Sequence, residues 1–234
     1  MTVADFALQL KTETKKSHTA AENTKFVGSF LRGVVSKESY KQLVANFYFI
    51  YRAMEEEVDK LKGDPIVSKI AYDELNRVNN LERDLRYFYG PNWRAIITPS
   101  DACQQYVNRI REVADEDTEL LVGHHYTRYL GDLSGGQILR GIAEKALNLP
   151  KGEGLYFYEF EKIEDKKEFK TKYRASLNEL PINQSQANAI INEANYAFRL
   201  NMYMFDTLEG NWFQSLIKMI IGFITSILKK RKSE

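Results

Sequence analysis

Apolar residues recur at intervals of three and four along most of this chain, which is the spacing of helices with one buried face. We therefore expect an all-α fold, a single-domain bundle of about eight helices. The segments expected to be helical are residues 4–23, 26–35, 36–61, 66–75, 78–89, 99–113, 120–149, 165–178 and 184–208. Residues 155–160 alternate somewhat like a strand, but a lone strand is marginal, so we expect an extended connector there.

Three glycines fall inside the helical pattern of residues 120–149, namely Gly131, Gly135 and Gly136. Each glycine inside a helix costs roughly 0.5–1 kcal/mol relative to alanine. Gly131 and Gly135 are four residues apart and therefore share one face of the helix. A face without side chains lets a flat ligand approach the backbone, and adjacent glycines permit a kink, which we expect here.

Three polar residues, Arg128, Asp132 and Ser134, accompany these glycines and are placed to direct hydrogen bonds at such a ligand. The alternative is that small residues allow two helices to pack closely, and for a lone pair of glycines we would favour that interpretation. Spacing alone therefore leaves both interpretations open.

The first expected helix carries a line of polar residues, in which Lys11, Lys15, His18 and Glu22 follow one another at steps of four, three and four. An imidazole at this position could bind a metal. A histidine at the edge of an apolar face is nevertheless more often a packed core residue. The pattern by itself favours that alternative.

Composition restricts the class of protein. The net charge of +1 argues against a general nucleic-acid binder, which needs many cations to neutralise phosphates. Cys103 is the only cysteine, so neither a disulfide framework nor a cysteine metal site is possible, and this fits a reducing compartment. Glu55, Glu56 and Glu57 are expected on a solvated face, because no Glu-x-x-His pair accompanies them as a di-iron site requires.

Two long runs of this sequence resemble the signature segments of haem oxygenases. Residues 126–137 read YTRYLGDLSGGQ and are similar to the distal helix of that family. Residues 10–23 read LKTETKKSHTAAEN and are similar to its proximal helix. The resemblance extends from about Leu8 to about Asn211. It implies a haem-oxygenase-like helical bundle with haem b between these two helices, as both cofactor and substrate.

The resemblance also implies an iron ligand. His18 matches the histidine that binds the haem iron, and Glu22 is placed to fix the tautomer of its ring. His124 and His125 are the only other histidines and therefore the rival candidates. We interpret both of them as structural.

For catalysis, the resemblance implies Asp132 acting through ordered water, with Arg128 and Tyr51 supporting the hydrogen-bond network. The bent glycine backbone would shield all but one edge of the ring. The positions that match haem-contacting segments of the family are Lys11, Lys15, Glu22, Tyr126, Thr127, Gly131, Ser134, Gly135, Gly136, Lys170, Arg174, Phe198, Asn201 and Phe205.

Lys15, Tyr126, Lys170 and Arg174 are expected to hold the haem propionates and so to set the rotation of the ring, because ammonium and guanidinium groups suit flexible carboxylates. From spacing alone, Lys170 and Arg174 would be an exposed basic face. The implied reaction is oxidative cleavage at the α-meso carbon to biliverdin IXα, ferrous iron and carbon monoxide, with dioxygen and external electrons. A haem-binding or carrier protein without catalysis is the alternative.

The chain shows no flavin or nicotinamide motif, so electrons must come from another protein. The sequence looks most like the cyanobacterial and plastid branch of the family, which implies ferredoxin as donor, a role in bilin synthesis for photosynthesis, and a location in the cytoplasm or plastid stroma. Acidic ferredoxin would be attracted by a basic rim made of Lys11, Lys15, Lys16, Lys170, Lys172 and Arg174.

The last residues differ from the rest. We expect a catalytic domain over residues 1–210 and a tail over residues 211–234, in which apolar residues fall on one face and Lys229–Lys232 add positive charge. A bilayer span needs about 20 mainly apolar residues, and Lys218 interrupts this shorter run. The tail is expected to be an amphipathic helix that docks on the domain or makes weak contact with an anionic membrane surface. A membrane-surface interaction protein is therefore a third possible class.

Overall fold

Helices form the regular structure of the chain in a computed structural model, which describes the backbone of residues 3–230 and the side chains of residues 3–208. No strand occurs in that part, so the predicted all-α class is confirmed. In chain order the elements are α1 (Phe6–Glu13), α2 (Lys15–Glu22), α3 (Lys25–Leu31), α4 (Lys37–Lys60), η1 (Val67–Lys69), η2 (Asp73–Leu75), α5 (Val78–Tyr89), η3 (Trp93–Ala95), α6 (Asp101–Glu116), η4 (Thr118–Leu120), α7 (Leu121–His125), η5 (Tyr126–Leu130), α8 (Gly131–Ala146), η6 (Tyr156–Tyr158), α9 (Lys166–Asn178) and α10 (Gln184–Lys230).

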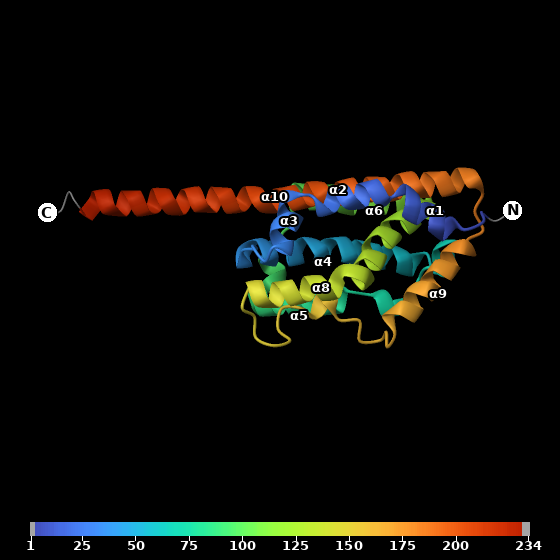
Figure 1. Ribbon diagram of the computed structural model, residues 1–234, viewed down its shortest axis with the longest axis horizontal. Coiled ribbons are helices and arrows are strands. Elements are labelled where there is room, and N and C mark those ends of the chain that lie inside the picture. Colours follow the sequence, from blue (N-terminus) through green and yellow to red (C-terminus); the bar gives the residue numbers. More distant parts are fainter. Residues whose placement is uncertain (1–2, 231–234) are drawn as a thin grey trace.

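The helices lie in layers. Figure 1 shows α10 along the whole length of the molecule, with α2 and α6 beside it and α4 beneath. A lower layer holds α5 and α8, and α9 lies at the end of the bundle away from the C-terminus (Figure 1). Since α4 packs against α5, α6 and α10, it is the helix around which the core forms.

A long apolar stripe explains the central position of α4. Ile50, Tyr51 and Met54 are at most 1% exposed. The helix begins where the sequence predicted, because Oγ of Ser36 accepts the N–H of Ser39 at 3.0 Å and so satisfies one free donor of the first turn.

The helix expected over residues 4–23 is in fact two helices, α1 and α2, separated at Thr14. The Thr14 hydroxyl donates to the carbonyl of Leu10 at 2.6 Å, and threonine bonds of this kind bend helices. The bend lets α1 pack against α9 while α2 follows α10. The segment expected as a helix over residues 66–75 forms only the single turns η1 and η2. The backbone is extended at Tyr72, directly before η2, and this separates the two turns.

Two of the three consecutive glutamates in α4 are not on a solvated face, so that prediction was wrong for them. Glu57 is 4% exposed and pairs with Lys60 at 2.9 Å. Oε1 of Glu55 accepts the N–H groups of Arg77 and Val78, the second at 3.1 Å, and so caps the start of α5. Burial raises the pKa of Glu55 to about 7. Periodicity in α4 could not reveal that the beginning of another helix would need this carboxylate.

The connector after α8 is held by polar side chains of α5. The carboxylate of Asp84 accepts the N–H groups of Tyr156 and Phe157, each at 2.8 Å. Nδ2 of Asn80 donates to the carbonyls of Tyr156 and Glu159 at 3.0 and 2.9 Å. The segment forms the single 3₁₀ turn η6 instead of a strand, because side chains satisfy its backbone groups.

The glycine-rich helix is continuous from Leu121 to Ala146, but its hydrogen-bond pattern changes in the middle. The kink was expected at Gly131, Gly135 and Gly136, yet these residues lie in the regular helix α8. The irregular part is η5, a π-helical turn that directly precedes Gly131. The extra residue of a π turn rotates the helix that follows it. The irregular turn therefore precedes the predicted position of the kink by about one turn.

The last helix continues past the bundle. The core helix was expected to end near Leu208, but α10 extends to Lys230 and projects beyond the other helices (Figure 1). The side chains on which the predicted tail amphipathicity depends lie outside those that the structure describes. In the part of the chain that is described, no helix has the length and apolar character required to cross a membrane.

At Gly123 the backbone of α7 packs closely against the backbone of α10. A methyl group on Gly123 would lie 2.8 Å from the backbone nitrogen of Ala194 and 2.9 Å from the carbonyl oxygen of Ile190, both in α10. Backbone atoms cannot move aside as a flexible side chain can. The absence of a side chain at this position is therefore what brings α7 against α10.

We predict that Gly123→Ala lowers the free energy of unfolding by about 1–3 kcal/mol, because the added methyl forces two helix backbones apart. Gly141→Ala is the matched control, since a methyl group at that α8 position meets no atom within 4 Å. The control should leave stability unchanged or raise it by about 0.5–1 kcal/mol through helix propensity. Urea unfolding of the two variants checks this, and equal stabilities would contradict it.

Candidate functional site

Arg128 of η5 is the centre of a buried hydrogen-bond network. Its Nε donates to the hydroxyl of Tyr51 at 3.0 Å, and Nη1 donates to Oδ1 of Asn201 at 2.7 Å. Nη2 lies 3.5 Å from Oδ1 of Asp132, whose other oxygen accepts the Tyr51 hydroxyl. The three residues expected to support catalysis thus meet, although they come from α4, η5 and α8.

Burial and charge act on this network in opposite directions. Burial raises the pKa of the Asp132 carboxyl, while the charge of Arg128 and the hydrogen bond from Tyr51 lower it in part. Burial also raises the pKa of Tyr51 well above its usual range, so its hydroxyl remains a donor. Burial opposes the charge on Arg128, but the nearby Tyr51 and Asp132 more than offset it and its pKa is raised. The network therefore holds a buried cation beside a carboxyl whose pKa is above its usual value.

The glycines of α8 divide into two kinds. Around the positions where Gly131 and Gly135 would carry a side chain, no atom lies within 4 Å, so these two residues present bare backbone to open space. A side chain on Gly136 would instead meet the ring of Tyr158 at 3.4 Å. Of the two interpretations left open by the spacing, Gly131 and Gly135 fit an approaching ligand, whereas Gly136 fits close packing. Ser134 is exposed on the same helix.

His18 of α2 has an accessible imidazole. Its side chain is 53% exposed, and Nδ1 lies 3.5 Å from Oε2 of Glu22. The edge of the ring meets Phe198 of α10, with ring centroids 5.8 Å apart and planes at 76°. An imidazole that is supported on one side and open on the other is suited to bind a metal centre from outside the helix.

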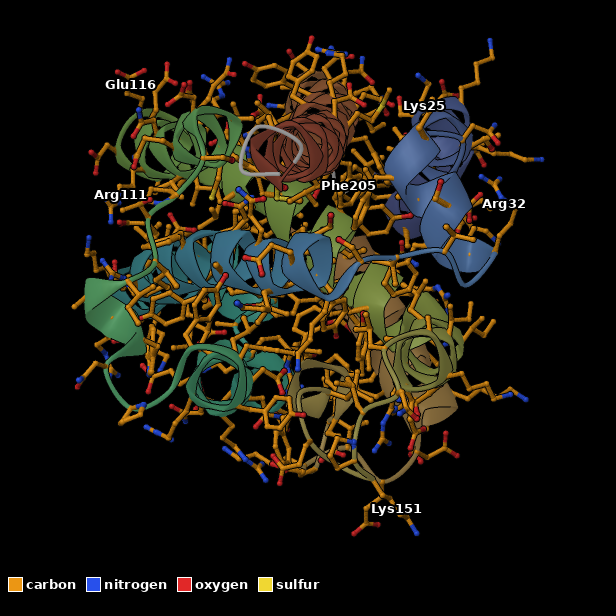
Figure 2. All side chains as sticks on the ribbon, turned by 90° about the vertical axis from the view of Figure 1, so that its left-hand side faces the viewer. Lys25, Arg32, Arg111, Glu116, Lys151 and Phe205 are labelled. Carbon is orange, nitrogen blue, oxygen red and sulfur yellow. The ribbon has the colours of Figure 1, made fainter. Side chains whose placement is uncertain are left out.

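α10 joins the two halves of the site. Phe198 contacts His18, and Asn201, three residues later on the same face, accepts from Arg128. Phe205, two turns after Phe198, stacks on Phe26 of α3 with ring centroids 5.9 Å apart. Figure 2 shows Phe205 on the side of α10 that faces the N-terminal helices. All three predicted residues of α10 therefore lie along the region between the N-terminal helices and the Arg128 network.

The residues predicted to hold carboxylates come from four elements, α1, α2, η5 and α9, at one end of this region. Burial raises the pKa of Tyr126, while the side chain of Thr14, where α1 meets α2, and the charge of Arg174 in α9 lower it in part, so both residues are nearby. Arg174 is exposed. The remaining predicted cations are half-exposed or exposed in the same helices, namely Lys170 in α9, Lys11 in α1 and Lys15 in α2.

Three residues of α7 and η5 form hydrogen bonds within the core. Oγ1 of Thr127 donates to the carbonyl of Gly123 at 2.8 Å, so this predicted haem contact is directed into the protein instead. Nε2 of His124 lies 2.8 Å from Oε1 of Glu193, and Nδ1 of His125 lies 2.7 Å from the Tyr173 hydroxyl. Both histidines are at most 2% exposed.

Two members of the network were not predicted. Nδ2 of Asn201 donates to the hydroxyl of Tyr106 in α6 at 3.4 Å, and the guanidinium of Arg128 lies over the ring of Phe47, 4.4 Å from its centroid. The signal for Tyr106 was a hydroxyl on an otherwise apolar helix face. That signal is weak, because most such tyrosines are ordinary core residues.

These features fit a flat, iron-containing ring with carboxylate arms. His18 offers a free imidazole edge, Gly131 and Gly135 offer backbone that a planar ligand can approach closely, and the cations gather at one end. Among the described residues, no group of three or more histidine, cysteine, aspartate or glutamate side chains could hold a bare metal ion. The single accessible imidazole of His18 suits iron that arrives already bound in a macrocycle.

Comparison with known proteins gives the same result for the whole chain. The family model described as Heme oxygenase matches residues 4–207. Heme oxygenase 1 of Synechocystis is 54% identical over 230 residues, which cover 98% of this chain and 94% of that protein. Heme oxygenase 1 of Nostoc is 53% identical over 222 residues, covering 95% of this chain and 93% of that protein.

A solved structure agrees as well. The crystal structure of heme oxygenase-1 from Synechocystis in complex with heme superimposes with a TM-score of 0.89 at 53% identity, covering 94% of this chain and 100% of that one. A family model that matches most of the sequence and a relative of this similarity leave one assignment. This chain belongs to the haem oxygenase family.

Proposed function

We propose that this protein is a haem oxygenase that binds haem b through His18 and cleaves it at the α-meso carbon to biliverdin IXα, ferrous iron and carbon monoxide. The observation that supports this most directly is the i, i+3 pair on α10, because Phe198 touches the free imidazole and Asn201 touches the Arg128–Asp132 network. The same short piece of helix thus sets the distance between an iron ligand and a proton-handling carboxyl.

Bound haem would supply the iron that binds dioxygen and accepts electrons, and also the carbon skeleton that is oxidised. The protein supplies position and protons. Tyr51 and Arg128 hold the Asp132 carboxyl by a hydrogen bond and a close ionic contact, so it faces the site in one orientation. Since burial raises the pKa of Asp132, this carboxyl can accept and return a proton close to the oxygen that reacts.

Regiochemistry would follow from how the ring is held. Gly131 and Gly135 bring bare backbone against one part of the ring and shield it, so the exposed meso edge is the one that reacts. Lys15, Tyr126, Lys170 and Arg174 would fix the propionates at the junction of α1, α2, η5 and α9, and so prevent the ring from rotating. Lys11 is a weaker candidate, because it lies one turn further along.

Ferredoxin is proposed as the electron donor, in a cyanobacterial cytoplasm or a plastid stroma. The basic rim of Lys11, Lys15, Lys16, Lys170, Lys172 and Arg174 lies on α1, α2 and α9, and α1 packs against both α2 and α9, so the helices that carry these charges are neighbours. An acidic redox protein would be attracted there. Residues 1–210 would form the catalytic domain, with residues 211–234 as an accessory tail that contacts the domain or an anionic membrane.

We predict that His18→Ala abolishes the one-to-one Soret complex with hemin and the formation of a bilin when electrons are supplied. The His18 side chain is half-exposed, so the melting temperature of the haem-free protein should change little. Spectral titration and thermal unfolding of the same preparation check both points. An intact Soret complex in a folded variant would contradict the assignment of His18.

We predict that Asp132→Asn retains haem binding within about threefold but lowers the rate of bilin formation roughly 100-fold, as expected when a proton-transferring group is lost. Asp115→Asn is the control, because Asp115 is exposed at the end of α6. This experiment separates the enzyme from a haem carrier without catalysis. A carrier would bind haem equally well in all three proteins and form no bilin in any of them.

We predict that the double variant Lys16→Glu/Lys172→Glu slows turnover with reduced ferredoxin several-fold but not turnover with ascorbate, because only the first requires docking. Lys151→Glu/Lys162→Glu is the matched control. Lys151 lies on the loop on the opposite side of the molecule from α10 and the N-terminal helices (Figure 2). If ferredoxin- and ascorbate-driven rates fall equally in the first variant, the docking proposal is wrong.

A further inference from the structure

We infer that His125 and Tyr173 are positioning residues, which fix α9 against the distal helix and thereby place the cations that orient the haem. The inference rests on the function proposed above. Nδ1 of His125 lies 2.7 Å from the hydroxyl of Tyr173. Their rings are nearly parallel, at 6°, with centroids 5.6 Å apart. His125 is 2% exposed and Tyr173 is fully buried.

The contact is a rigid one. Burial lowers the pKa of His125 to about 3, so the imidazole is neutral at physiological pH, and burial keeps the Tyr173 hydroxyl protonated. The other neighbour of the imidazole is the ring of Tyr129, with centroids 4.3 Å apart. An aromatic pair with one hydrogen bond and packing on both sides has very few alternative arrangements.

His125 and Tyr173 are next in sequence to residues proposed to hold the propionates. Tyr173 directly precedes Arg174 and follows Lys170 by three residues, so any shift of Tyr173 also moves the backbone of both cations. His125 directly precedes Tyr126, the fourth residue proposed to hold the propionates. The hydrogen bond therefore links the two backbone segments that carry these groups, one in α9 and one in η5.

α9 has other anchors, but they join it to other parts of the domain. The hydroxyl of Tyr72 is 2.6 Å from Oγ of Ser176, and the backbone N–H of Ala7 donates to Oδ1 of Asn178 at 2.9 Å. The ring of Tyr72 also packs on Phe169 and Tyr173, with centroids 5.2 and 6.1 Å apart, so these contacts hold α9 on the segment before η2. Among the hydrogen bonds of the described residues, only the one between His125 and Tyr173 joins α9 to the segment beside Tyr126, so its loss should change orientation more than it changes folding.

The test uses Tyr173→Phe, which removes only the hydroxyl, and His125→Phe, which removes the ring nitrogens. Tyr72→Phe is the matched control, since it removes a hydroxyl that bonds the same helix. Three quantities are measured on each full-length protein: the dissociation constant for hemin, the ring-methyl proton resonances of the ferric cyanide complex, and the isomers of biliverdin formed.

We expect Tyr173→Phe and His125→Phe to weaken hemin binding about three- to tenfold, as a displaced charge-assisted hydrogen bond would. A second set of ring-methyl resonances and a second biliverdin isomer should appear. Tyr72→Phe should leave all three quantities as in the unmodified protein. If Tyr72→Phe has the same effects, or if the two test variants show one unchanged set of resonances, the positioning role is refuted.

A double-variant cycle with Arg174→Gln distinguishes positioning from general stability. If Tyr173 acts through Arg174, then adding Tyr173→Phe to Arg174→Gln should weaken hemin binding by much less than it does alone. Fully additive effects would overturn the inference. If Arg174→Gln alone changes neither affinity nor resonances, the proposed propionate role of Arg174 fails first, and the inference falls with it. An effect of Arg174→Gln without one of Tyr173→Phe refutes the inference only.

Discussion

One buried guanidinium connects the layers of this protein. Arg128 is 7% exposed, and its contacts come from α4 through Tyr51 and Phe47, from α8 through Asp132, and from α10 through Asn201. A buried charge is tolerated only when partners surround it, so these helices must meet in one arrangement for the cation to be stable. The geometry that orients the Asp132 carboxyl is therefore also a condition for the fold.

Glycine serves two purposes within a single helical segment, and the structure separates them. Gly123 lets α7 approach the backbone of α10, which fixes the depth of the distal helix. Gly131 and Gly135 instead leave backbone that no other helix covers, where a planar substrate can approach. The π-helical turn η5 lies between these positions and sets their relative rotation. Packing on one side and access on the other thus depend on one irregular turn.

Buried carboxylates stabilise the irregular backbone around this site. Glu55 caps the start of α5, and Asp84 binds two N–H groups of the connector after α8. That connector in turn meets α8, because Gln137 donates to the carbonyl of Tyr158 at 3.0 Å. Burial raises the pKa of Glu55 and of Asp84 to about 7 each. These carboxylates accept backbone hydrogen bonds, but their burial makes them harder to ionise. They hold segments that side-chain packing alone could not hold.

The sequence by itself determined the all-α class, most helix positions, the cap at Ser36, and the family through two uninterrupted motifs, because all of these depend on neighbours within a few turns. Tertiary structure alone decided the bend at Thr14, the place of the π turn, the capping of α5 by Glu55, and the division of roles among the glycines. It also decided that Tyr106 joins the Arg128 network. Each of these depends on an atom far away in the chain, and spacing along one helix carries no information about what another helix brings to it.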